Sequence, residues 1–290
     1  MSIIPPPKHI ALSELLPDKP LLLMGAGPVP IPDAVAKANG LVINHLGETM
    51  DAVIERVKLM AQYAFQTKSK NILGISGPAT AAMEMAITSL LWKGRKILVL
   101  QNGTFSSRFA ELAQGVGANV TVIETQNFRP FTLEQVQEAT AKDQYDVLSI
   151  VQGETSCGLL NKNLKKITQY CHQQKILTIV DAVCTLTTTP LEMDRWNIDI
   201  ALTGGQKGLS SIPGVSLIAF SNQAWEVVKK RSAPMPHWVL DPKRAAEFWH
   251  HKKYHYTAPV PGILAMHEAL RFICQEGLQN RFLSHKVCSE

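Results

Sequence analysis

The sequence predicts an α/β fold in which a mostly parallel sheet is covered by helices. Segments with the apolar pattern of a strand alternate with segments of helical periodicity along most of the 290-residue chain. Several strand-like segments, such as ILTIV at 176–180, are apolar throughout, which is typical of strands buried on both faces. Alternation of such strands with helices favours parallel strands joined by helical crossovers. The length is sufficient for a substantial core.

The expected helices are the segments in which apolar residues recur every three or four positions. The first, DAVIERVKLMAQYAF, precedes the first strand, and each later helix follows a strand and its turn. The predicted helices span residues 51–65, 79–91, 105–116, 132–141 and 164–174.

The expected strands are short apolar runs that stop at turn-forming residues. KILVL, for example, is stopped by Asn102-Gly103, and NILGI by the turn around Gly77 and Pro78. The predicted strands span residues 71–75, 96–100, 118–123, 146–151, 176–180, 198–202 and 215–220.

Residues 1–20 are expected to form an extended arm, because five prolines there remove backbone donors. Arms of this kind often lie over a neighbouring molecule, which favours a dimer. The sequence contains no internal repeat and no low-complexity tract.

Composition narrows the classes of function. The chain carries 29 Lys and Arg against 24 Asp and Glu, a mild excess of +5 without the dense basic block typical of nucleic-acid binders. We expect no nucleic-acid partner, no metal site and, without an apolar run of about 18 residues, no membrane span. The five cysteines are odd in number and widely spaced, which favours free thiols in a reducing compartment. No signal peptide is recognised, so a cytoplasmic protein is expected, with the peroxisome and mitochondrion left open.

The residues that follow the strands carry the chemistry, because ligands of such sheets bind beyond the carboxyl ends of the strands. The turn from Ser76 to Thr80 opens a helix, and it fits either an anion site or an ordinary helix cap. Asp181 ends an apolar strand and acts either as a buried functional carboxylate or as a structural one.

Two further side chains have similar alternatives. Lys207 stands between glycines after another strand, and it is either a reactive amine or a solvated loop lysine. Phe105 opens a helix, where it either stacks on a planar ligand or packs in the core. An anion cradle, an aromatic ring, a carboxylate and a lysine at one edge are together what pyridoxal phosphate requires.

The sequence resembles the class-V pyridoxal-phosphate aminotransferases, and among them the alanine–glyoxylate and serine–pyruvate aminotransferase group. The resemblance runs from about residue 21 to about residue 280. It rests on the order and spacing of MGAGPVPIP, NHLGETM, SGPATAAME, NGTFSSRFAEL, QGETSCG, VDAVCTL, GGQKGL with its following IPG, and YHYTAPVPGILAMHEAL. It implies the large domain of the pyridoxal-phosphate transferase fold type I over residues 21–274, with residues 275–290 beginning a C-terminal small domain that is largely absent from the chain.

The resemblance also implies roles around the cofactor ring. Lys207 and Asp181 are the catalytic residues: Lys207 bonds the cofactor, and Asp181 pairs with the pyridinium nitrogen. Phe105 takes the stacking position, where relatives often carry Trp. Ser156 is expected beside the ring, and Gly25 in the N-terminal turn is expected to approach the substrate.

Further roles concern the phosphate group. Ala79 and Thr80 occupy the positions of the phosphate cradle, helped by Gln206. Tyr254 and Thr257 match a pair that reaches the cofactor of the neighbouring subunit. The resemblance therefore implies a homodimer in which two chains complete each active site.

Three departures from the family pattern stand out. The phosphate turn reads Gly-Pro-Ala where many relatives have Gly-Ser-Gly, so Pro78 supplies no N–H donor. Phe105 is a smaller ring than Trp. No residue matches the arginine that clamps the substrate carboxylate in the family's C-terminal domain, and Arg108 and Arg271 are the cations considered as its replacement.

The function implied is transfer of an amino group from a small amino acid, alanine or serine, to a 2-oxo acid, glyoxylate or pyruvate. One alternative is a non-catalytic subunit or truncated product without the substrate clamp. Another is a cysteine desulfurase or lyase of the same fold, for which Cys157 and Cys288 are the available thiols. A Rossmann dinucleotide site is set aside, because GAGP at 25–28 lacks the third glycine of G-x-G-x-x-G.

Overall fold

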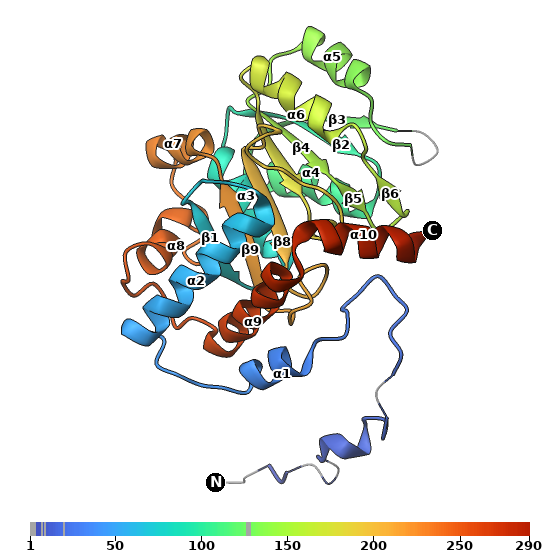
Figure 1. Cartoon of the computed structure of the whole chain (residues 1–290). Coiled ribbons are helices and arrows are strands. Elements are labelled where there is room, and N and C mark those ends of the chain that lie inside the picture. The colour runs from blue at the N-terminus through green and yellow to red at the C-terminus, as the bar shows by residue number, and fades with distance from the viewer. Residues whose placement is uncertain (1–3, 7, 9, 20, 126–128) are drawn as a thin grey trace.

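A seven-stranded sheet forms the centre of the protein, in the order β1-β9-β8-β7-β4-β2-β3 (Figure 1). The computed structural model describes residues 4–6, 8, 10–19, 21–125 and 129–290. The strands of this sheet are β1 (Ile72–Ser76), β2 (Lys96–Gln101), β3 (Asn119–Glu124), β4 (Val147–Val151), β7 (Leu177–Asp181), β8 (Ile200–Gly204) and β9 (Val215–Phe220). A separate two-stranded ribbon joins β5 (Gly153–Glu154) to β6 (Leu159–Leu160). All seven predicted strands are present within two residues of the expected bounds.

The strand directions confirm a mostly parallel sheet. Pairs β2–β3, β2–β4, β4–β7 and β7–β8 are parallel, whereas β9 runs antiparallel to both β8 and β1. The reversal at β9 follows from its connection: residues 205–214 are too few for a helical crossover, so the chain turns back beside β8. That short connection carries Lys207 at the carboxyl end of β8.

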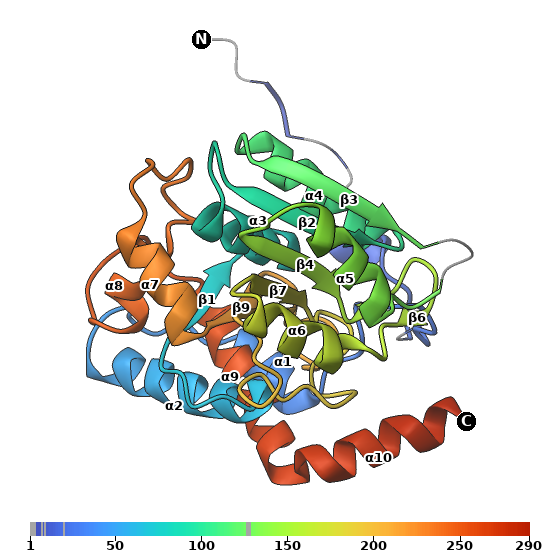
Figure 2. The ribbon, with the colours of Figure 1, turned by 90° about the horizontal axis from the view of Figure 1, so that it is seen from above.

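Helices cover both faces of the sheet. They are α1 (Asp33–Asn39), α2 (Glu48–Phe65), α3 (Ala79–Leu90), α4 (Thr104–Gly115), α5 (Leu133–Lys142), α6 (Leu164–Gln173), α7 (Asn222–Lys230), α8 (Pro242–Trp249), α9 (Val260–Glu276) and α10 (Leu278–Ser289). Figure 2 shows α3 and α4 on the opposite side of the sheet from α5 and α6. Right-handed crossovers produce this division, because the chain steps one way along the sheet through α3 and α4 and the other way through α5 and α6.

Burial explains the apolar strand sequences. Every residue of β4, β7, β8 and β9 is buried, because helices lie on both sides of them. β1 and β2 are buried except at end residues, and β3, at one edge of the sheet, is partly exposed along its length. The uninterrupted apolar runs are therefore central strands, as the sequence predicts.

Both ends of the chain contain helical elements that were not predicted from the sequence. The N-terminal arm extends away from the body in Figure 1 and contains one 3₁₀ turn, η1 (Leu12–Glu14). Helices α7 to α10 follow β9. The first of them has a recognisable start at Ser221, whose hydroxyl accepts the backbone N–H of Ala224.

Candidate active site

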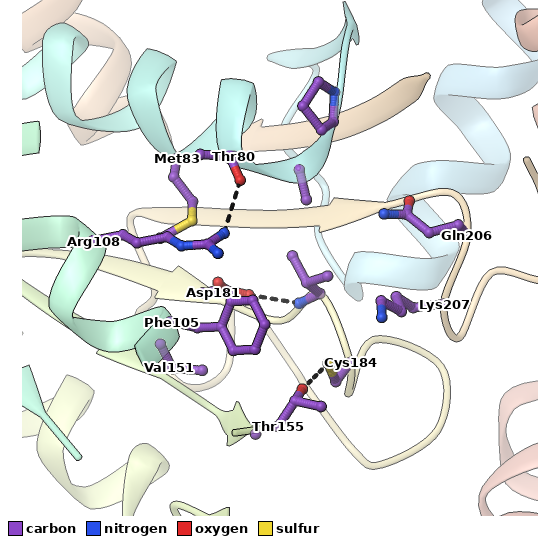
Figure 3. A pocket seen from close by; sticks show the side chains of 14 residues that line it. Thr80, Met83, Phe105, Arg108, Val151, Thr155, Asp181, Cys184, Gln206 and Lys207 are labelled. Atoms are coloured by element: carbon purple, nitrogen blue, oxygen red, sulfur yellow. Dashed lines mark hydrogen bonds between the residues drawn. The ribbon is translucent and has the colours of Figure 1, made fainter. Parts of the chain in front are cut away.

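A cavity of about 170 Å³ lies where the parallel strands reach their carboxyl ends (Figure 3). Its walls come from the segments after β1, β2, β4, β7 and β8. They consist of Pro78, Ala79, Thr80, Met83, Phe105, Arg108, Val151, Gly153, Thr155, Asp181, Val183, Cys184, Gln206 and Lys207. This edge is where strand-end reasoning places a ligand.

The cavity brings together six of the ten residues singled out from the sequence: Ala79, Thr80, Phe105, Asp181, Gln206 and Lys207. They lie far apart in the chain and meet because consecutive parallel strands all end at this edge. The other four, Gly25, Ser156, Tyr254 and Thr257, are not among the lining residues.

Lys207 presents its amine to the cavity from the loop after β8. Its Nζ donates a hydrogen bond of 2.5 Å to the carbonyl oxygen of Ala26. Gly27 adopts φ +101°, a backbone conformation that favours glycine, and a Cβ there would lie 2.8 Å from Lys207 Cδ. Gly25 belongs to the same turn but is exposed, with nothing within 4 Å of a Cβ at its position. The turn meets Lys207 through residues 26 and 27.

Asp181 is the last residue of β7 and is 4% exposed. Its Oδ1 accepts the backbone N–H of Val183 at 2.8 Å. Burial raises the pKa of Asp181 to about 7; the Val183 N–H opposes this, the charge of Glu154 adds to it, and the charge of Arg108 opposes it. The carboxyl therefore titrates near neutral pH in the unliganded chain.

Phe105 reaches the cavity from the first turn of α4, half buried. The guanidinium of Arg108 lies over the same ring, with Cζ 4.7 Å from the ring centroid. Residues three apart share a helix face, so the two side chains reach the cavity together. Arg108 could not be placed from the sequence, although its spacing of three residues from Phe105 on a predicted helix was a signal that relates the two side chains.

The start of α3 supplies backbone donors. The helix begins at Ala79, and no side chain caps it. The first N–H groups of a helix lack intrahelical partners and attract anions. Gln206 stands nearby, and in the described part of the chain its buried Oε1 has no hydrogen-bond partner. The Thr80 hydroxyl accepts a hydrogen bond of 3.1 Å from Arg108 Nη1.

Ser156 serves the start of α4. Its Oγ donates to Glu154 Oε1 at 2.6 Å and accepts the backbone N–H of Thr104 at 2.9 Å, while Thr155 lines the cavity in its place. Its assignment beside the cofactor ring stays a prediction, and the geometry gives it a supporting position.

Glu154 is a buried residue to which the sequence analysis gave no role. Its carboxylate accepts the backbone N–H of Phe105 at 3.2 Å and of Ser106 at 2.8 Å, as well as the Ser156 hydroxyl. Burial opposes its ionisation, but the hydrogen bond from Ser156 and those from the α4 backbone outweigh burial and lower its pKa. An anion at a helix N-terminus is also favoured by the helix dipole. Glu154 thereby fixes the end of α4 that carries Phe105.

We predict that Glu154→Gln lowers the free energy of unfolding by about 1–3 kcal/mol, because hydrogen bonds to a buried charged acceptor are lost or weakened. Urea unfolding measures this. Glu134→Gln is the matched control, because Glu134 is an exposed acid in the first turn of α5. Equal stability of the two variants would contradict the role of Glu154.

Tyr254 and Thr257 lie outside the cavity of their own chain. Both are exposed, Tyr254 to 60%, and the Tyr254 ring packs edge-on against His45 with centroids 5.8 Å apart. This position is compatible with a site in another chain, and their role stays a prediction.

The cysteines and arginines differ in their access to the cavity, and Cys184 is a lining thiol that was not singled out from the sequence. Cys184 lines it and shares a hydrogen bond of 2.5 Å with the Thr155 hydroxyl; burial raises its thiol pKa, which disfavours the reactive thiolate. Cys157 and Cys288 do not line it. Of the two arginines considered as carboxylate clamps, Arg108 lines the cavity and Arg271 does not. Arg271 lies on α9, where it pairs with Glu268.

A lysine amine and a buried carboxyl line one cavity at the carboxyl edge of a mostly parallel α/β sheet, an arrangement that fits a transaminase. The comparisons make the class specific. The model of the family "Aminotransferase class-V" matches residues 33–286, and the chain belongs to this family.

Relatives with known names support the assignment. The chain is 35% identical to alanine–glyoxylate aminotransferase of Oryctolagus cuniculus over 293 residues, covering 99% of this chain and 74% of the relative. A solved alanine–glyoxylate aminotransferase from Nostoc sp. matches with a TM-score of 0.87 and 30% identity, covering 95% of this chain and 74% of that one. Ureidoglycine–glyoxylate aminotransferase from Bacillus subtilis matches with a TM-score of 0.87 and 27% identity over 92% and 70% of the two chains.

These findings show an enzyme of amino-group transfer and favour neither alternative. A cysteine desulfurase from Escherichia coli shares the fold alone, at 16% identity and a TM-score of 0.66. Within the described residues, none of the helices has the length and apolar character to cross a membrane.

Proposed function

We propose that this chain is a pyridoxal-phosphate-dependent aminotransferase that moves the amino group of alanine or serine to glyoxylate or pyruvate. The observation that carries the proposal is the Lys207 amine and the buried Asp181 carboxyl on the walls of one cavity. The family, and relatives named alanine–glyoxylate aminotransferase, support the substrate class.

The residues present fit pyridoxal phosphate. Asp181 would pair with the ring nitrogen and Phe105 would cover one face of the ring. The start of α3 at Ala79 and Thr80 has no side-chain cap, and the Gln206 amide lines the same cavity. Backbone N–H groups, the Thr80 hydroxyl and the amide N–H of Gln206 are donors that a phosphate accepts. Ser156 would act by holding Thr104 and Glu154 at the start of α4.

When bound, pyridoxal phosphate supplies an electron sink for charge that develops on the substrate carbon. The chain's own groups do the rest. Lys207 Nζ takes the proton from Cα of the amino acid and returns one in the reverse half-reaction. Asp181, held at the end of β7, keeps a proton on the ring nitrogen. The turn containing Gly25 covers the amine, so it would lie over the substrate.

We also propose a homodimer with shared active sites. Tyr254 and Thr257 are exposed beside the body, where they would reach the phosphate in the partner's site. The segment that follows the N-terminal arm exposes a run of large apolar side chains at Leu21, Leu22, Leu23 and Met24, which a second chain would bury. The five free cysteines fit a cytoplasmic location.

A mixing experiment tests the shared site. Lys207→Ala and Tyr254→Ala chains are each expected to be poorly active alone. Random reassociation makes half of the dimers mixed, and each mixed dimer has one intact site, so about one quarter of wild-type activity should return. No recovery after verified subunit exchange would contradict sharing of Tyr254.

The function itself is tested by spectroscopy on the purified chain with pyridoxal phosphate. We expect a near-visible absorption band that bleaches on addition of L-alanine and returns on addition of glyoxylate. A band that ignores alanine, serine and other small amino acids would overturn the proposed reaction. No band at any cofactor concentration would overturn cofactor binding.

A further inference from the structure

Arg108 is a cation inside the cavity for which the family resemblance supplies no role. It extends from α4 between the Thr80 hydroxyl, 3.1 Å from Nη1, and the Phe105 ring, 4.7 Å from Cζ. Both contacts lie on the cavity wall, and they hold the guanidinium from two directions. In the described part of the chain, no carboxylate lies within ion-pair distance of it.

The charge of an arginine does not titrate in proteins, so an uncancelled guanidinium acts on its surroundings at every relevant pH. Low-dielectric walls strengthen that action compared with bulk water.

The charged and titratable groups that face Asp181 come from several elements. The charge of Glu154 on β5 opposes ionisation of the Asp181 carboxyl, and the charge of Arg108 on α4 favours it. Lys207, after β8, and Cys184, after β7, line the same cavity. If Lys207 is bound covalently to a cofactor, its amine no longer provides a full free charge. Arg108 is then the permanent cation of the cavity wall.

The position of Arg108 argues against a role at the substrate carboxylate. Figure 3 shows its guanidinium beside Thr80, with Asp181 between it and Lys207. In a pyridine ring that pairs its nitrogen with Asp181, the carbon that reacts at Lys207 is on the opposite side of the ring. The substrate would therefore sit at the far end of the cavity from Arg108.

We propose that Arg108 is a positioning residue whose guanidinium, on the wall of the same cavity, favours the charged form of the Asp181 carboxyl against the effect of burial, so that the carboxylate can pair with the ring nitrogen. This proposal rests on the proposed function. The contacts with Thr80 and Phe105 keep the cation near the carboxylate without a direct ion pair, so the carboxylate oxygens stay available to the ligand.

The test measures the titration of Asp181 directly, by carboxyl ¹³C NMR on the full chain without added cofactor. Arg108→Met should raise the pKa of Asp181 further above its free value, as loss of a nearby opposite charge does. Arg108→Lys should leave it near the wild-type value. Arg271→Met is the matched control, because Arg271 also lies over a phenylalanine ring, Phe272, but outside the cavity.

Two results would overturn the proposal. An unchanged titration in Arg108→Met would show that the charge does not act on Asp181. Equal rises in Arg108→Met, Arg108→Lys and Thr80→Val would show that the packing of the guanidinium, and not its charge, is what matters.

Ligand affinity separates Arg108 from the phosphate cradle. If Arg108 acts through Asp181, Arg108→Met should weaken binding of pyridoxal and of pyridoxal phosphate by the same factor. A loss confined to pyridoxal phosphate would place the role at the phosphate and overturn the proposal. Because the NMR titration needs no cofactor, failure of this proposal is distinguishable from failure of the proposed function.

Discussion

Replacing Lys207 by alanine should reduce amino transfer by about 10³-fold or more, because one change removes both the amine that bonds the cofactor and the base that moves the substrate proton. The near-visible band of the cofactor-loaded protein should be lost or shifted at the same time. Initial rates with alanine and glyoxylate, and absorbance spectra of the same samples, measure the two effects.

The change should leave the fold intact. Lys207 projects into a cavity, and its hydrogen-bond acceptor, the Ala26 carbonyl, belongs to an exposed turn. The free energy of unfolding should therefore change by no more than about 1 kcal/mol. Lys253→Ala is the control, because Lys253 pairs with Glu247 at the surface. A Lys207→Ala chain with normal turnover would rule out the proposed reaction.

The sheet could be predicted because its central strands are buried on both faces. Short, mainly apolar runs such as β7 and β9 fit strands buried on both faces, and the turn residues after them mark their ends. The cavity was predictable for the same reason. Parallel strands end at one edge, so Asp181 and Lys207 were expected at the same edge, and the pairing of β7 with β8 brings them together.

The parts that could not be predicted depend on contacts between distant segments. Glu154 follows a strand like the other candidates, but only the fold shows that its carboxylate meets the α4 backbone. Ser156 and Thr155 are adjacent in sequence, and the direction of the β5–β6 ribbon decides that Thr155 lines the cavity. The position of Tyr254 outside its own cavity requires knowledge of how residues 231–259 cross the body.

Asp181→Asn should lower amino transfer by about 10²-fold or more, because the neutral amide does not stabilise a protonated ring nitrogen in a buried site. The substitution nearly preserves the size of the side chain, and the amide oxygen still accepts the Val183 N–H. The loss is therefore expected in rate and cofactor affinity without a large change of fold. Steady-state rates and equilibrium dialysis with pyridoxal phosphate measure it. Wild-type affinity in this variant would exclude pairing of Asp181 with the ring.

The pH dependence of unfolding, compared between the wild type and Asp181→Asn, provides a second measurement. Because the pKa of Asp181 rises from 3.8 to about 7 on folding, the folded chain without cofactor holds an extra proton between these values. The free energy of unfolding should therefore fall as pH rises from about 4 to 7, by roughly 4 kcal/mol from this group. Burial also raises the pKa of Asp199, which contributes with the same sign, so the difference between wild type and Asp181→Asn isolates Asp181.

Cofactor binding should depend on pH in the opposite direction, because the charged carboxylate is the form that pairs with a protonated ring. Affinity for pyridoxal phosphate should fall as pH drops through about 7 in the wild type and change much less in Asp181→Asn. The unliganded chain gains stability from the proton that the cofactor must displace. Parallel curves for the two proteins would mean that another group controls binding. If stability and affinity change with pH in opposite directions in the wild type but not in Asp181→Asn, Asp181 is the residue that links them.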